Sequence, residues 1–336
     1  MDSIMETIGV LTSGGDAPGM NAAVRAVVRK GIYEGLKVVG IRKGYAGMIE
    51  SEFQVLERRS VADIVHRGGT FLGSARCEEF KTKEGRAEAI RQLKYAGIDG
   101  VIVIGGDGSF KGAQLLSEES DIGVIGVPGT IDNDIACTDT TIGFDTAMNT
   151  ILDAINRIRD TATSHERTFI IEVMGRHSGF LALMSGLGGG AESILIPEVE
   201  LDIDKVCQKL KKGYERGKLH SIILVAEGVG DNFETDRDLH ESKAFILGEK
   251  ISECTGLETR VTVLGHLQRG GAPTAQDRIM ASRLGAAAVE YLLAGETNQM
   301  LGMVHDEVKA TPLAEALETE KEINQEILDL ANILSM

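Results

Sequence analysis

Short apolar runs that end in glycine- and aspartate-rich turns are the feature that most restricts what this chain can fold into. Such runs occupy residues 8–11, 101–104 and 122–127, and the turns after them read SGGD (13–16), GGDGS (105–109) and PGTIDND (128–134). Continuous apolar runs of this length are typical of parallel strands that are buried on both faces. Ligands of open α/β sheets bind at the carboxyl ends of such strands, so we expect the three turns to carry the chemistry.

Helix-like segments alternate with the apolar runs. A first series contains helical patterns over residues 21–30 and 86–96 and a further apolar run at 38–41. A second series begins beyond residue 143, with a helical pattern over 147–159 and strand-like runs at 168–173, 193–196 and 222–225. This alternation predicts an α/β protein made of βαβ units, with two three-layer domains, mainly parallel sheets and an active-site cleft between the domains.

Composition narrows the class of protein. A chain of 336 residues with 43% hydrophobic content is long enough for two domains. No run approaches the ~20 apolar residues of a membrane span, and the acidic start MDSIME is unlike a signal peptide, so we expect a soluble cytoplasmic protein without a membrane partner. The net charge of −16 argues against nucleic acid as a partner.

The four cysteines predict neither a disulfide framework nor a zinc site. Cys77, Cys137, Cys207 and Cys254 lie far apart in the sequence, and none of them belongs to a C-x-x-C motif. We therefore expect four separate, reduced thiols.

The glycine-rich turns suit phosphate groups. Glycine lets backbone N–H groups approach an anion closely, and a helix that follows presents its positive amino-terminal end. Gly14-Gly15 and the turn at 105–108 have this form, although neither is a P-loop and no G-x-G-x-x-G motif lies between a strand and a helix. Asp107 in the second turn is a candidate Mg²⁺ ligand, because Mg²⁺ on a nucleotide needs only one or two carboxylates.

An ordered series of longer motifs extends this interpretation. SGGDAPGMN, GGTFLGSAR, GGDGS, PGTIDND, MGRHSG, AEG and TRVTVLGHLQRGG follow one another between residue 8 and about residue 295. In content and order the series resembles the ATP-dependent 6-phosphofructokinase family of bacterial type. NAD and lipid kinases share GGDG, but they do not account for PGTIDND or GHLQRGG.

The resemblance implies a reaction and a domain plan. The reaction is phosphoryl transfer from MgATP to the 1-hydroxyl of fructose 6-phosphate, which gives fructose 1,6-bisphosphate and ADP and is the committed step of glycolysis. Residues 1–142 and about 272–320 are expected to form a large ATP-binding domain, and residues 143–271 and about 321–336 a smaller domain that binds the sugar phosphate.

Site residues follow from the same resemblance. Asp132 is the candidate base, and Arg176 with the backbone of Gly15 and Thr130 is expected to stabilise the phosphoryl group in transit. Asp134 either assists the metal ion or is an ordinary turn residue. The residues expected to bind ATP are Gly15, Arg76, Cys77, Gly106, Asp107, Gly108 and Ser109. Those expected to bind fructose 6-phosphate are Thr130, Ile131, Asp132, Arg167, Met174, Gly175, Arg176, Glu227, Arg260, His266 and Arg269.

Subunit contacts and regulation are also implied. In the family the arginines that match Arg167 and Arg260 come from a neighbouring subunit, so a homotetramer is expected. ADP as activator and phosphoenolpyruvate as inhibitor would share a second anion site. Its expected residues are Arg25, Arg29, Arg58, Asp63, Arg159, Gly190, Glu192, Arg216, Lys218 and His220. Exposed basic residues are common on helices, so an ordinary solvated face remains the alternative for this set.

Two other functions stay open from the sequence. A pyrophosphate-dependent phosphofructokinase typically has Asp at the position of Gly108 and Lys at that of Gly129, so the two glycines favour ATP. A non-catalytic regulatory subunit would be expected to have lost Asp107, Asp132 or Arg176, and all three are present. The stretch 228–253 is longer than in the bacterial enzymes of the family; we expect an acidic loop over 231–238 followed by a helix.

Overall fold

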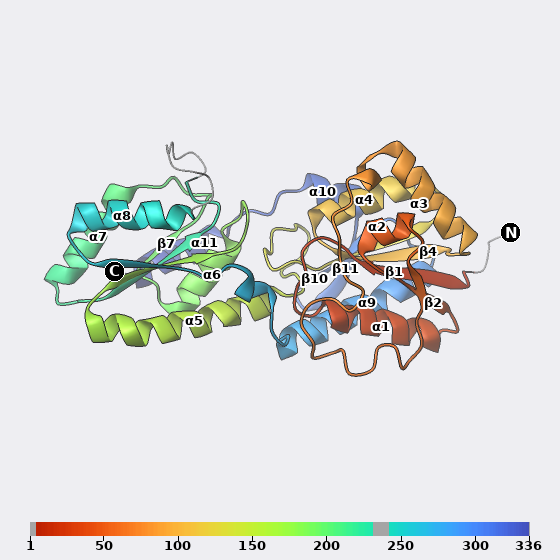
Figure 1. The fold of residues 1–336 in the computed structure, drawn as a ribbon, viewed down its shortest axis with the longest axis horizontal. Helices are drawn as coiled ribbons and strands as arrows, with labels where there is room; N and C mark the ends of the chain where they lie inside the picture. Colours follow the sequence, from red (N-terminus) through yellow and green to blue (C-terminus); the bar gives the residue numbers. More distant parts are fainter. Residues whose placement is uncertain (1–4, 231–241, 336) are drawn as a thin grey trace. The chain divides into compact units, whose positions relative to one another are not determined.

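The computed structural model describes residues 5–230 and 242–335, and the chain divides into two compact units. Unit 1 comprises Met1–Ile131, Ile135–Thr146 and Arg269–Lys321, and unit 2 comprises Asp132–Asp134, Ala147–Gln268 and Glu322–Met336. Each unit has its own sheet flanked by helices (Figure 1), so the predicted α/β class with mainly parallel sheets is confirmed.

Unit 1 is built on a seven-stranded sheet with the order β11-β10-β5-β4-β1-β2-β3. Its strands are β1 (Thr7–Thr12), β2 (Lys37–Ile41), β3 (Phe53–Val55), β4 (Gly100–Gly105), β5 (Gly123–Pro128), β10 (Gln299–Val304) and β11 (Glu307–Pro312). The strands from β10 to β2 run parallel, whereas β3 and β11 pair antiparallel at the two edges. Every residue of β1 and β4 is buried, which explains their continuous apolar sequence.

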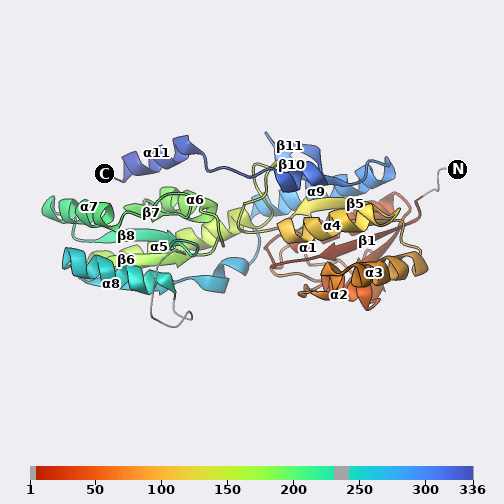
Figure 2. The ribbon, with the colours of Figure 1, turned by 90° about the horizontal axis from the view of Figure 1, so that it is seen from above.

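Helices cover both faces of this sheet (Figure 2). One face packs against α2 (Gly44–Ile49), α3 (Lys83–Tyr95), α4 (Asp107–Glu118) and α10 (Leu313–Glu318), and the other against α1 (Met20–Tyr33) and α9 (Ala275–Leu293). On the first face the ring of Tyr45 stacks on Phe80 with centroids 4.0 Å apart. The Tyr45 hydroxyl donates to the Ser109 carbonyl oxygen (2.6 Å), and burial raises the pKa of this phenol. Tyr45 thereby ties α2 to the first turn of α4.

Unit 2 contains a four-stranded parallel sheet with the order β7-β8-β6-β9. Its strands are β6 (Thr168–Val173), β7 (Ser193–Leu195), β8 (Ser221–Ala226) and β9 (Thr259–Val263). The helices α7 (Ile203–Glu215) and α8 (Lys243–Thr255) lie side by side, α6 (Phe180–Gly189) packs on β7 and β8, and α11 (Gln325–Leu334) packs on α6. The helix expected after the long stretch is α8, whereas residues 231–241 lie outside the described part of the chain.

A buried carboxylate starts α5 (Phe144–His165), the helix that begins in unit 1 and continues into unit 2. Asp277 of α9 accepts hydrogen bonds from the Gly143 N–H (2.9 Å), the Thr146 N–H (2.9 Å) and the Thr146 hydroxyl. Desolvation raises the pKa of Asp277, and the three donors oppose that shift. The carboxylate satisfies amino-terminal N–H groups that the helix itself leaves unpaired.

One sequence-based expectation is wrong. Cys207 of α7 and Cys254 of α8 form a disulfide with Cα atoms 6.4 Å apart, while Cys77 and Cys137 are free. The separation of 47 residues concealed this pair, because the packing of α7 against α8 brings the two cysteines together. No helix among residues 5–230 and 242–335 is long and apolar enough to cross a membrane.

Candidate active site

Three neighbouring strands of unit 1 carry their turns to one edge of the sheet. β1 pairs with β4, and β4 pairs with β5, all parallel, so the turns at residues 13–16, 105–109 and 128–134 begin side by side. The ladder continues into them, because the Ser13 N–H donates to Ile104 O (2.9 Å) and the Gly129 N–H donates to Gly105 O (2.9 Å). The three turns thus lie at the edge of the sheet where ligands of open α/β sheets bind, and their role in the chemistry stays a prediction.

Backbone packing is close at Gly105 and open at Gly108. A Cβ added at Gly105 would lie 2.5 Å from both Ser109 Oγ and Ser13 O, a separation that real Cβ atoms do not show. A Cβ at Gly108 would meet nothing within 4 Å. The first glycine is therefore required by the fold, and the second leaves the amino-terminal turn of α4 accessible to an anion.

Asp107 is the first residue of α4, and its side chain is 51% exposed. It pairs with Lys111 one turn further along (2.8 Å). No group of three or more His, Cys, Asp or Glu side chains suited to a metal ion occurs in the described ranges. Mg²⁺ that is held mostly by nucleotide phosphates and water needs only one or two carboxylates, so the exposed Asp107 fits such an ion.

Arg269 lies against the first glycine turn. Its Nη1 donates to Asp16 O (3.1 Å), and a Cβ on Gly15 would lie 2.6 Å from that nitrogen. An arginine expected to bind the sugar phosphate thus contacts a turn expected to bind ATP, both within unit 1. The segment before Arg76 and Cys77 is tied to the same turn, since the Ser74 hydroxyl donates to Gly14 O (2.6 Å).

The two aspartates of PGTIDND differ in their surroundings. Asp132 is 4% exposed, whereas Asp134 is exposed to solvent. Thr130 is buried beside Ile131, and its carbonyl accepts from the Thr141 hydroxyl (2.6 Å). A base that must exclude competing water is better placed at Asp132 than at Asp134.

The turn after β6, residues 174–179, is held by side chains from other elements of unit 2. The Met174 N–H donates to Gln268 Oε1 (3.1 Å), the Arg176 N–H to Glu227 Oε1 (2.6 Å) and the Gly179 N–H to Glu198 Oε1 (2.7 Å). Arg176 has a φ of 54°, a left-handed conformation that is uncommon for a residue with a side chain. The three acceptors fix this turn, and two of them, Gln268 and Glu198, were not identified from the sequence.

Arg167 and Arg260 lie at the other end of the sheet of unit 2. Arg167 precedes β6, and Arg260 is the second residue of β9. Both form ion pairs with Glu258, and the distance from Arg167 Nε to Glu258 Oε2 is 3.0 Å. The hydrogen bond from Arg167 lowers the pKa of Glu258, and the charge of Arg260 adds to this effect. Arg176, Glu227 and His266 lie in three separate turns that follow the carboxyl ends of β6, β8 and β9, about 20 Å away along a six-residue strand. The two arginines are therefore separated from the other expected sugar-phosphate residues of unit 2.

Comparisons with known proteins identify the family of the chain. A family model described as phosphofructokinase matches residues 7–292. The chain belongs to the phosphofructokinase family. The ATP-dependent 6-phosphofructokinase of Halothermothrix orenii is 68% identical over 332 residues, which are 99% of this chain and 100% of that protein. The enzyme of the same description from Bacillus subtilis is 57% identical over 332 residues, with the same shares.

A solved structure extends the match within the phosphofructokinase family. The phosphofructokinase structure from Saccharomyces cerevisiae has a TM-score of 0.87 and 36% identity to this chain, covering 98% of this chain and 48% of that chain. A pyrophosphate-dependent phosphofructokinase from Marinobacter aquaeolei has a TM-score of 0.82 at 24% identity, covering 98% of this chain and 91% of that chain, and this likeness concerns the fold alone.

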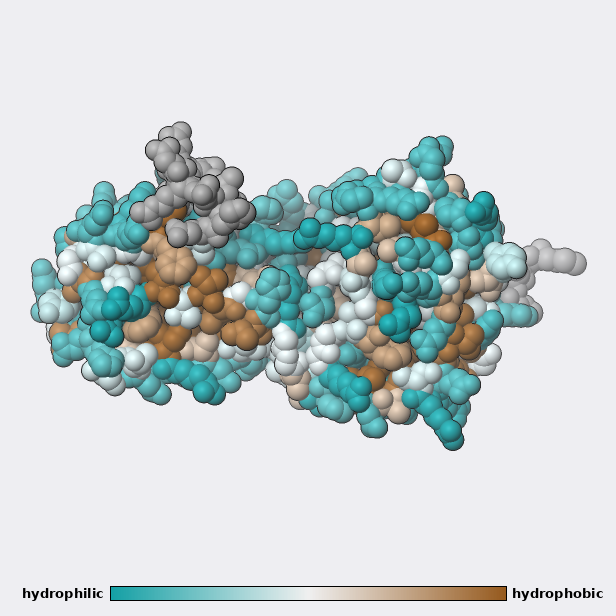
Figure 3. Space-filling model, in the orientation of Figure 1, coloured by the Kyte–Doolittle hydropathy of each residue, from teal (hydrophilic) through white to brown (hydrophobic). Residues whose placement is uncertain are grey.

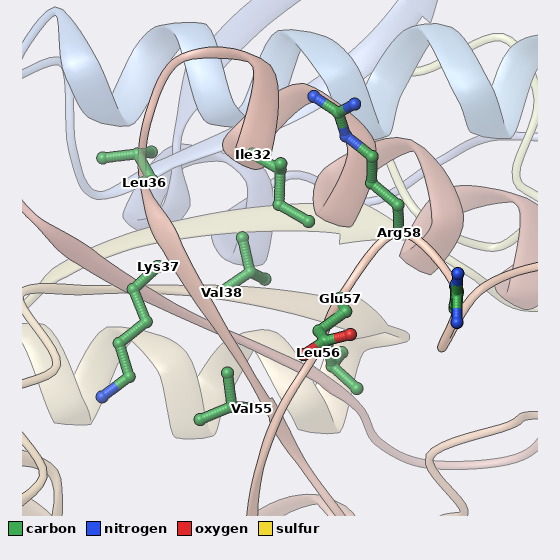
Figure 4. Close-up of a pocket in the computed structure, with 9 residues that line it drawn as sticks. Ile32, Leu36, Lys37, Val38, Val55, Leu56, Glu57 and Arg58 are labelled. Carbon is green, nitrogen blue, oxygen red and sulfur yellow. The ribbon is translucent and has the colours of Figure 1, made fainter.

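The residues expected at the phosphofructokinase effector site fall into two sets. In unit 1, Arg25 and Arg29 lie one turn apart on α1, and burial together with the charge of Arg29 lowers the pKa of Arg25. Arg58 lines a pocket of about 400 Å³ with apolar residues such as Ile32 and Val38 (Figure 4). Asp63 lies five residues after Arg58 and has a φ of 56°. The first set thus contains the cations Arg25, Arg29 and Arg58, of which Arg58 lines the apolar pocket.

The second set lies in unit 2, and two of its cations, Lys218 and Arg159, have polar partners there. Lys218 contacts the buried Glu192 (2.6 Å), and Arg159 donates to the carbonyls of Gly189 and Gly190, the latter at 3.1 Å. Arg216 is the residue that caps the carboxyl end of α7, and His220 directly precedes β8. The contacts of Lys218 and Arg159 do not involve Arg216.

Proposed function

We infer that this protein transfers the γ-phosphoryl group of MgATP to the 1-hydroxyl of fructose 6-phosphate, giving fructose 1,6-bisphosphate and ADP. The full-length identity of 68% to an ATP-dependent 6-phosphofructokinase carries this conclusion. The adjacent turns after β1, β4 and β5 supply a physical basis, because phosphoryl transfer depends mainly on positioning and charge neutralisation.

The roles of individual residues are our proposal. Asp132, buried at the end of the third turn, accepts the proton of the attacking hydroxyl. Arg176 and the backbone N–H groups of Gly15 and Thr130 stabilise the charge on the transferring group. Asp107 holds Mg²⁺, which neutralises the nucleotide phosphates when it is bound.

ATP rather than pyrophosphate is the proposed donor. A Cβ added at Gly108 would meet no protein atom within 4 Å, so the backbone there is accessible. A carboxylate at this position would project toward nucleotide phosphates bound at the start of α4. At Gly129 a Cβ would lie 3.2 Å from both Ile104 and Met20, so a lysine at this position would require the core to repack. Glycine at both positions suits a site in which backbone N–H groups bind the nucleotide.

A coupled assay with the purified chain tests this function. Fructose 6-phosphate and Mg²⁺ are supplied with either ATP or pyrophosphate, and formation of fructose 1,6-bisphosphate is followed. We expect turnover with ATP and little with pyrophosphate. Preference for pyrophosphate would support the alternative donor, and no turnover with either would support a non-catalytic regulatory subunit.

We further propose a homotetramer in which Arg167 and Arg260 act in a neighbouring subunit. Their distance of about 20 Å from the turn of Arg176 along a parallel strand supports this assignment. β9 is an edge strand of its sheet, and the exposed Val263 and Leu267 lie on and just after it. Figure 3 shows hydrophobic side chains gathered on one face of unit 2, a feature typical of protein interfaces.

Regulation by ADP and phosphoenolpyruvate, and a cytoplasmic location, complete the proposal. Arg25 and Arg29 place two positive charges one turn apart on a chain of net charge −16, which an anionic effector would require, and Arg58 lines the pocket beside Ile32 of the same helix. Arg216 and Lys218 of unit 2 would contribute from their own set.

A further inference from the structure

Gln268 is a fully buried amide that joins two turns of unit 2. It lies in η2 (Gly265–Arg269), and its side chain is 0% exposed. Its Oε1 accepts from the Met174 N–H (3.1 Å), and its Nε2 donates to Gly265 O (2.9 Å). Met174 is 94 residues away in sequence, so the contact depends on the tertiary fold.

The amide takes the place of a backbone partner where strand pairing ends. β6 and β9 are paired in parallel up to Glu172 and Val263, and the Leu264 N–H still donates to Glu172 O (3.1 Å). In a parallel pair, every second N–H of a strand points to the same neighbour, so the next donor toward β9 is Met174. That donor bonds to the side chain of Gln268 instead of to the main chain of β9.

Both turns carry residues proposed to hold fructose 6-phosphate. Met174 opens the turn with Arg176, and η2 contains His266 and Arg269. We propose that Gln268 is a positioning residue for the sugar phosphate, setting the spacing between these two turns. The inference rests on the proposed role of Arg176 and η2. A neutral amide suits the position because it offers one acceptor and one donor, whereas a carboxylate offers only acceptors and a thioether offers no donor.

The test uses the full-length enzyme with Gln268→Met, which keeps the volume of the side chain and removes both hydrogen bonds. We expect KM for fructose 6-phosphate to rise roughly 10- to 100-fold, since small displacements of binding groups have effects of this size. KM for ATP should stay within about twofold, which is the level of ordinary indirect effects. Gln268→Glu keeps an acceptor for Met174 but loses the donor for Gly265, and it should show the same separation of the two KM values.

Glu172→Ala is the matched control. Glu172 is a buried polar residue of β6 whose carboxylate accepts from Ser242 and Ala244 at the start of α8. This variant should lower the melting temperature and leave KM for fructose 6-phosphate unchanged. A native KM for fructose 6-phosphate in both Gln268 variants, or equal increases in the two KM values, overturns the positioning role. Arg176→Ala, measured in parallel, tests the proposed sugar-phosphate site itself. A native KM for fructose 6-phosphate in Arg176→Ala would show that the sugar phosphate binds elsewhere, whereas a raised KM in this variant with a native KM in the Gln268 variants would overturn only the positioning role.

Discussion

The turns of unit 1 and the turn 174–179 of unit 2 are held in place by opposite means. In unit 1, Gly105 and Gly15 bring backbone and neighbouring side chains so close that one added carbon would collide. In unit 2, the side chains of Gln268, Glu227 and Glu198 each accept one backbone N–H of the turn. Unit 1 should therefore be damaged by adding atoms, and unit 2 by removing them.

The ligands proposed for each turn account for the difference. The phosphate groups proposed to bind in unit 1 would be held by backbone N–H groups, which any Cβ nearby would obstruct, so glycines suit its turns. The turn of unit 2 presents the side chain of Arg176 from a left-handed backbone, a conformation that persists only when the surroundings impose it. The three acceptors provide that constraint.

Asp132→Asn should produce the largest effect on turnover. It separates a loss of chemistry from a loss of positioning, whether by the packed glycines of unit 1 or by the side-chain acceptors of unit 2. The variant keeps the size of the buried side chain and removes the base, so kcat should fall by about 10²- to 10⁴-fold. Steady-state kinetics and direct binding of fructose 6-phosphate measure the two consequences. If kcat stayed near native, Asp132 would have to be reassigned to positioning.

Gly105→Ala tests the sensitivity of unit 1 to added atoms. The methyl group would force apart Ser13 and Ser109, so we expect unfolding to become easier by about 1–3 kcal/mol and kcat/KM for ATP to fall about tenfold or more. Gly108→Ala is the control for stability, because its added carbon meets no protein atom within 4 Å. Denaturant unfolding of the two variants should differ, and similar free energies of unfolding would break the comparison.

Glu198→Ala tests the sensitivity of unit 2 to removed atoms. Loss of the charged acceptor leaves the Gly179 N–H unsatisfied and should lower the free energy of unfolding by about 1.5–3 kcal/mol. KM for fructose 6-phosphate should rise while KM for ATP does not. Glu200→Ala, which removes another exposed carboxylate two residues further on, should change stability by only about 0.5 kcal/mol or less. Equal effects of the two substitutions would argue against a supporting role for Glu198.

The smallest effect concerns a side-chain contact inside unit 1 that lies away from its glycine turns. Arg86 of α3 donates from Nε (2.9 Å) and Nη2 (2.8 Å) to the two carboxylate oxygens of Glu119, and these hydrogen bonds lower the pKa of Glu119. A lowered carboxyl pKa in the folded state stabilises the fold above the unfolded pKa, and this contribution is lost as the pH falls through the folded pKa. Glu119→Gln should cost about 1 kcal/mol at neutral pH, and the difference from wild type should shrink in acid. Urea unfolding at both pH values measures it; a difference that grows in acid would have the wrong sign.

Parts of the fold that depend on local sequence could be predicted. The buried strands β1, β4 and β5 read as apolar runs, and α1, α3 and α5 have the expected helical patterns. The edge strands β3, β9 and β11 were missed, and the turn into β11 uses His305 and Asp306 at positive φ, where Asn-Gly would be the usual signal. Edge strands have few buried residues, so their sequence carries a weak pattern. The interior strand β10 was also missed, although it is mostly buried.

The candidate site shows the same division. Glycines and aspartates directly after strands were recognisable, because their role depends on the turn in which they lie. Gln268, Glu198 and Tyr45 were not, because each acts on a residue distant in sequence. The pairing of Cys207 with Cys254 was not predicted for the same reason.

The burial of Tyr45 makes the core beneath α4 visible to spectroscopy. The chain has no tryptophan and five tyrosines, so its ultraviolet signal comes from few groups. Tyr33 and Tyr95 are 78% and 91% exposed, whereas Tyr45 is buried, and its raised pKa delays its ionisation until its hydroxyl reaches water. The absorbance change of Tyr45 in an alkaline titration therefore reports the separation of α2 from the turn that begins α4, and a nucleotide bound at that turn should shift this change to higher pH.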